Sequence, residues 1–67
     1  MGRLYDACQY VIGEISAKGL DPFKSRGAIA LETGFLVSMV TPNDPDDPEK
    51  LQALKDAALK VVGIAIP

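Results

Sequence analysis

The segment from Arg26 to Thr41, RGAIALETGFLVSMVT, limits most strongly what this chain can fold into. Nine of the thirteen residues from Ala28 to Val40 are apolar, a denser run than any other in the sequence. Apolar surface of this extent is unfavourable in water. The run must therefore be covered by other parts of the chain or by a partner.

A helix is the favoured structure for this segment, because its apolar residues run continuously instead of alternating. The preceding pair Asp21-Pro22 has the chemistry of a helix start, since an aspartate caps free backbone amides and proline fits the first helical position. The pair Thr41-Pro42 stops it, because the residue before a proline is pushed out of helical conformation. We therefore predict a central helix over residues 22–40.

A β-hairpin over residues 28–40 is the alternative interpretation. Gly34 would then lie in a three-residue turn between two apolar strands. The C-terminal segment KVVGIAI would supply a third strand and give an α+β domain. The sequence leaves this alternative open, although the helix start at Asp21-Pro22 leads directly into the segment.

Two further helices are predicted beside the central one. Apolar residues at spacings of three and four predict a helix over about residues 3–18. This stripe consists of Leu4, Cys8, Val11 and Ile15. After the loop TPNDPDDP, the pair Asp47-Pro48 starts a helix over about residues 48–62. The chain is thus predicted to be a single all-α domain over residues 1–67, either a small bundle or an open helical arrangement completed by oligomerisation.

The predicted central helix carries a strip of small residues, which lie within about 80° of one another on a helical wheel. The strip consists of Gly27, Ala30, Gly34 and Ser38. Small side chains let helices approach closely, within one chain or between chains. Because this helix is apolar nearly all round, two neighbouring helices can cover only part of it. The predicted oligomer interface comprises Gly27, Ile29, Ala30, Leu31, Gly34, Phe35, Leu36, Ser38 and Val40.

The other common stabilisers of small domains are missing from the sequence. One cysteine and no histidine exclude an internal disulfide and the usual Cys/His zinc sites. The acidic loop over residues 43–49 has the oxygen ligands that calcium prefers, but it lacks the glycine and spacing of a calcium-binding loop. We predict no metal and no cofactor. Oligomerisation is the remaining stabiliser, because the core of such a short chain supplies only about 3–5 kcal/mol.

No catalytic residue is predicted. The carboxylates of the apolar part of the chain are scattered, and Cys8 lies on an apolar stripe, where a free cysteine is normally a core residue. We therefore predict a non-enzymatic protein–protein interaction or regulatory module that self-associates through the central helix, as a dimer or a higher homo-oligomer. A small subunit of a hetero-complex, bound to a different protein, is an alternative.

A small helix-turn-helix-like DNA-binding regulator is the other alternative. Lys24, Ser25 and Arg26 lie in the first turns of the central helix, where free amides favour an anion or a nucleic-acid phosphate. The net charge of −2 and the lack of a basic block argue against nucleic-acid binding. The start MGRLYDACQ lacks the pattern of a signal peptide, and the longest apolar run is shorter than the roughly 20 residues of a membrane span. A cytoplasmic protein without a membrane span is therefore expected.

Overall fold

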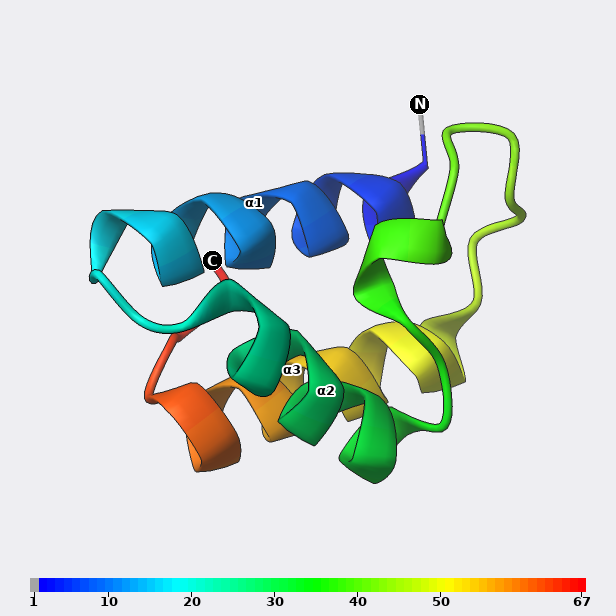
Figure 1. Cartoon of the computed structure of the whole chain (residues 1–67). Coiled ribbons are helices and arrows are strands. Elements are labelled where there is room, and N and C mark those ends of the chain that lie inside the picture. Colours follow the sequence, from blue (N-terminus) through cyan, green and yellow to red (C-terminus); the bar gives the residue numbers. More distant parts are fainter. Residues whose placement is uncertain (1) are drawn as a thin grey trace.

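The computed structural model describes residues 2–67, and these residues form an all-α fold without β-strands. Its elements are α1 (Arg3–Ala17), α2 (Pro22–Thr33), the short 3-10 helix η1 (Val37–Met39) and α3 (Pro48–Val62). Figure 1 shows α2 in front of α3, α1 along the top of the view, and η1 near the start of α1. The all-α prediction is confirmed, and the alternative hairpin over residues 28–40 does not form.

Aspartate caps start both α2 and α3, as the two Asp-Pro pairs predict. The Asp21 carboxylate accepts hydrogen bonds from the amides of Phe23, at 3.0 Å, and Lys24, at 3.3 Å. The Asp47 carboxylate accepts from the second and third residues of α3 in the same way, at 3.0 and 3.2 Å. A proline follows each cap at the first helical position, where its missing N–H costs nothing.

The cap of α3 gives a first testable prediction. Replacing Asp47 with alanine removes the acceptor for two backbone amides, so we expect a loss of about 1 kcal/mol in the free energy of unfolding. Urea unfolding followed by circular dichroism measures the change. Asn43→Ala, in the exposed part of the preceding loop, is the control. Equal midpoints for the two variants would show that the cap does not stabilise α3.

The core lies where α1 meets α2, η1 and α3. All four residues of the predicted stripe on α1 are buried, with Cys8, Val11 and Ile15 at 0% exposure. The other elements complete this core with Ile29, Val37, Leu54, Ala57, Ala58 and Ile64. Ile64 belongs to the tail after α3, whose backbone turns back because the Ile64 amide donates to the Ala58 carbonyl at 3.0 Å. Each long element therefore contributes at least one fully buried aliphatic side chain.

Helix α2 ends at Thr33, so the predicted helical end at residue 40 is wrong. Gly34 has a φ of 81°, in the left-handed region, and its amide donates to the Ala30 carbonyl at 2.8 Å. The Thr33 hydroxyl donates to the Ile29 carbonyl at 2.9 Å and accepts from the Phe35 amide at 3.4 Å. Glycine favours this termination because a residue with a Cβ is strained at positive φ. The chain therefore leaves the helix before it reaches η1.

Substitution of Gly34 tests this termination. Nothing lies within 4 Å of a Cβ added at Gly34, so the cost of Gly34→Ala is backbone strain and not a clash. We expect a loss of about 1–2 kcal/mol in unfolding free energy. Asn tolerates the left-handed region better than alanine, so Gly34→Asn should lose less. Thermal unfolding of both variants distinguishes this from a continuous helix, in which alanine would be the more stable of the two.

Candidate interaction face on helix α2

Two large apolar side chains of α2 are almost fully exposed. Phe23 and Leu31 are each 88% exposed. With Gly27 between them at spacings of four, they lie on one face of the helix. Ser25 and Ile29 point to the opposite side and are buried against the rest of the fold. Helix α2 therefore uses one narrow face for the core and presents a second apolar face outward.

An open groove of about 540 Å³ lies beside this outward face. Its lining residues come from the start of α2 and from the segment around η1, and they are Asp21, Pro22, Phe23, Arg26, Gly27, Leu36 and Ser38. A Cβ added at Gly27 would meet nothing within 4 Å, so the missing side chain leaves room above the helix backbone. We call Phe23, Gly27, Leu31 and Leu36 the α2 face from here on.

The exposed apolar surface continues from Leu36 into η1. Leu36 is 49% exposed and Met39 is 71% exposed. Val37, between them, is buried and holds the segment against the core. Leu36 and Met39 both line a second groove of about 270 Å³ that reaches the start of α3. Leu36 therefore lies between the groove on α2 and the groove on η1.

The structure separates the residues of the predicted small-residue strip. Gly34 and Ser38 lie beyond the end of α2, so the strip of Gly27, Ala30, Gly34 and Ser38 does not form as a continuous helical surface. Gly27 and Ser38 nevertheless line the same groove, because the chain folds back after Gly34. Ala30 is half-buried. Gly27 is thus the one residue of the strip that lies both on α2 and in the lining of this groove.

The remaining residues of the predicted interface fall into two groups. Leu31 and Leu36 are exposed and belong to the α2 face. Ile29 is fully buried in the core, while Phe35 and Val40 are half-buried and pack against it. The prediction did not include Phe23. Its signal in the sequence is the spacing of four from Phe23 through Gly27 to Leu31.

The three polar residues near the start of α2 do not form one exposed basic surface. Lys24 is exposed, whereas only 9% of Ser25 is accessible. Arg26 is half-buried, and its Nε donates to the Pro22 carbonyl at 3.2 Å. Lys24 is therefore the one exposed cation among these three residues. It offers little to a run of nucleic-acid phosphates.

The Cys8 thiol lies in the core, fully buried on the α1 stripe. Burial raises the pKa of this thiol from 9.0 to about 11, and the negative charge of Asp44 acts in the same direction. Because thiolate is the reactive form, the raised pKa and the burial both make Cys8 unreactive in the folded chain.

The raised pKa of Cys8 predicts a dependence of stability on pH. Below about pH 9 the thiol is protonated in both the folded and the unfolded chain, so it causes no change. Between about pH 9 and 11 the unfolded chain ionises first, and the free energy of unfolding should fall with rising pH. Urea midpoints of the native chain and of Cys8→Ala across this range measure the difference. Parallel curves would show that the thiol does not contribute.

Comparisons with protein-family models, with curated protein sequences and with solved structures found no match to this chain. Within residues 2–67, no three His, Cys, Asp or Glu side chains come together in a group that could hold a metal ion. No helix in this part of the chain is long and apolar enough to cross a membrane. The surface of the chain itself therefore provides the evidence for its function.

Proposed function

We propose that this chain is a non-enzymatic protein–protein interaction or regulatory module that self-associates through the α2 face. The observation that carries the proposal is the 88% exposure of both Phe23 and Leu31 on either side of Gly27. Scattered single apolar residues are normal on a protein surface, but exposed apolar side chains that share one helix face beside a groove are typical of interaction sites. The proposed partner is a second copy of this chain.

The order of residues on the α2 face suits a symmetric pair. When two copies of one helix cross antiparallel at Gly27, Phe23 of each copy faces Leu31 of the other, because both are four residues from the crossing point. A two-fold contact of this kind uses the same surface on both chains. Gly27, at the centre, lets the two backbones approach closely. Apolar side chains then meet apolar side chains on both sides of the crossing.

The charges around the groove are compatible with this pairing. Its lining carries one acid, Asp21, and one base, Arg26, so the groove has no formal net charge. Two identical surfaces of high net charge would repel each other on contact. The α2 face avoids this repulsion. Glu32, at the edge of the face, has its own cation, since Lys60 Nζ lies 3.5 Å from its Oε1.

The size of the surface sets the expected strength of the pair. The chain has an accessible surface of 4303 Å². A standard interface covers about 800 Å² per partner, which would be about a fifth of that surface. The α2 face and its continuation at Met39 contain far fewer residues than the roughly 20–30 that each partner contributes to a standard interface. We therefore expect a reversible dimer with a dissociation constant in the micromolar range, about 1–100 µM.

Sedimentation velocity over a concentration series tests the proposal. We expect the native chain to change from monomer to dimer as its concentration rises through the micromolar range. Leu31→Ser should remain a monomer, because it removes apolar contacts on both sides of the symmetric pair. Leu59→Ser is the matched control, since Leu59 is 60% exposed but lies on α3 and is not part of the α2 face. A native chain that stays monomeric throughout, or equal effects of both variants, would overturn self-association through α2.

A further inference from the structure

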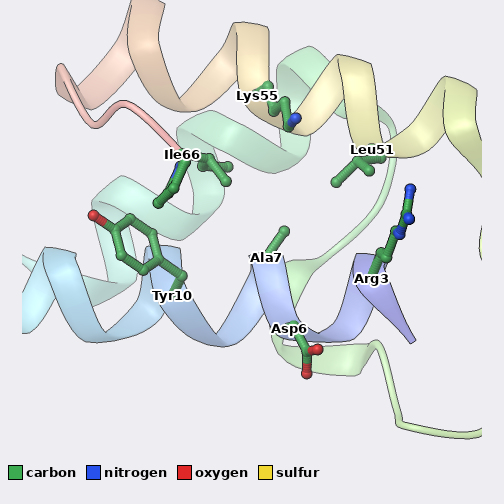
Figure 2. A pocket seen from close by; sticks show the side chains of 8 residues that line it. Arg3, Asp6, Ala7, Tyr10, Leu51, Lys55 and Ile66 are labelled. Atoms are coloured by element: carbon green, nitrogen blue, oxygen red, sulfur yellow. The ribbon is translucent and has the colours of Figure 1, made fainter. Parts of the chain in front are cut away.

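A separate groove lies between α1, α3 and the C-terminal tail, and α2 is behind it in the view of Figure 2. Its volume is about 430 Å³, within the range of about 300–1,000 Å³ that is usual for small-molecule sites. Its lining residues are Arg3, Asp6, Ala7, Tyr10, Leu51, Lys55, Ile66 and Pro67. The α2 face shares none of these residues.

The floor of this groove is apolar. Ala7 of α1 is almost fully buried, while Leu51 of α3 and Ile66 of the tail are half-buried against the core. Figure 2 shows these three side chains between the two helices. Tyr10 is 39% exposed and lines the groove. An apolar body of modest size can lie on this floor.

Two cations stand above the apolar floor, one on each helix. Arg3 is at the first residue of α1 and is exposed, and Lys55 of α3 is half-buried. Neither takes part in the ion pair found in residues 2–67, which joins Lys60 to Glu32. The one acid of the lining, Asp6, points away from α3 in Figure 2. The side chains of the lining, two cations and one acid, therefore carry a formal charge of +1 on a chain whose net charge is −2.

Polar and apolar groups are separated along the groove. Arg3 and Tyr10 are seven residues apart on α1, which corresponds to about 10 Å along the helix. Figure 2 shows Arg3 at one end, Tyr10 and Ile66 at the other, and Lys55 between them on the α3 side. A ligand with a charged end and an apolar end matches this order. Arg3 also lies at a helix N-terminus, where the helix dipole disfavours a cation, so an anion beside it would relieve that cost.

We propose that this groove binds a small monocarboxylate with an aromatic or short alkyl body. The carboxylate lies between the Arg3 guanidinium and the Lys55 ammonium, and both donate hydrogen bonds to its oxygens. The body lies on Ala7 and Leu51 and extends towards Tyr10 and Ile66. Each end of the ligand therefore meets groups of matching chemistry.

A titration with 3-phenylpropionate, followed by two-dimensional ¹H–¹⁵N NMR, tests the site. For a ligand of this size we expect a dissociation constant on the order of 1 mM. The neutral isostere 3-phenylpropanamide should bind about tenfold more weakly, because it lacks the charge that both cations recognise. The shifted amides should lie in α1, α3 and the tail. Equal binding of acid and amide, or shifts confined to the α2 face, would overturn the proposal.

Variants separate this site from a non-specific attraction of anions. We expect the double variant Arg3→Gln/Lys55→Gln to bind 3-phenylpropionate at least about tenfold more weakly. Lys60→Gln, one turn or so further along α3 and outside the groove, should bind it as the native chain does. Equal weakening by both variants would show that total charge, and not this groove, attracts the ligand. Because both cations are exposed or half-buried, circular dichroism should show that the variants stay folded.

Discussion

Replacing Ile29 with alanine is expected to leave the chain unfolded or barely stable at 25 °C. The Ile29 side chain is 0% exposed and is the buried apolar residue that α2 contributes to the core. Truncating a buried isoleucine to alanine typically costs 2–5 kcal/mol, from lost burial and from the cavity it leaves. The core of a chain this short supplies only about 3–5 kcal/mol in total. Urea unfolding at low protein concentration, followed by circular dichroism, measures the loss.

Leu31→Ala is the matched control for Ile29→Ala. Leu31 is two residues further along the same helix, but it is 88% exposed in the chain. Because alanine has a high helix propensity, we expect a change of less than about 0.5 kcal/mol in the unfolding free energy of the monomer. An Ile29→Ala variant that keeps the native unfolding midpoint but loses self-association would contradict this expectation. It would place Ile29 in the interface, as the sequence pattern suggested.

The starts of the helices could be predicted from the sequence because they depend on local chemistry. Asp21 and Asp47 each accept from two amides of the following turn, and each is followed by a proline in the first helical position. The partners of such a cap lie within three residues, so no knowledge of the distant chain is needed. The α1 stripe was predictable for a related reason, since a repeat at spacings of three and four defines one face of a helix.

The end of α2 was misjudged because apolar density was weighed above local termination chemistry. The run from Ala28 to Val40 is mostly apolar, but its two halves contribute to the core from different elements. Ile29 does so from α2 and Val37 from η1. The pair Thr33-Gly34 carries the signal for the break, as glycine at Gly19 does after α1 and at Gly63 after α3. A dense apolar run does not by itself distinguish one helix from two shorter elements.

The candidate site could be predicted only in part, because it depends on how the chain folds back. Gly27, Leu31 and Leu36 were placed in the interaction surface from sequence, and the structure exposes Leu31 and Leu36 beside the groove at Gly27. Ile29 was placed there too, since a helical wheel cannot show which apolar arc the other helices cover. Phe23 was not included, because it precedes the dense apolar run. The groove of Figure 2 joins α1, α3 and the tail, which no local pattern could reveal.

The substitution Gly27→Gln should abolish self-association while making the single chain slightly more stable. A Cβ at Gly27 meets nothing within 4 Å, so the longer side chain fits the monomer without a clash. Glutamine is a better helix former than glycine, which predicts a gain of about 0.5 kcal/mol in unfolding free energy. In the proposed pair, two such side chains would meet at the helix crossing. Their bulk and their desolvated amides should weaken the dimer about 100-fold.

Gly13→Gln is the matched control, because Gly13 is also helical, exposed and open to an added Cβ, but lies on α1. Both variants should unfold at a slightly higher urea concentration than the native chain when they are compared as monomers. Only Gly27→Gln should lose the dimer in sedimentation velocity. Opposite signs for stability and association cannot arise from a damaged fold, because damage would lower both. A Gly27→Gln chain that still dimerises like Gly13→Gln would place the contact elsewhere than the Gly27 crossing.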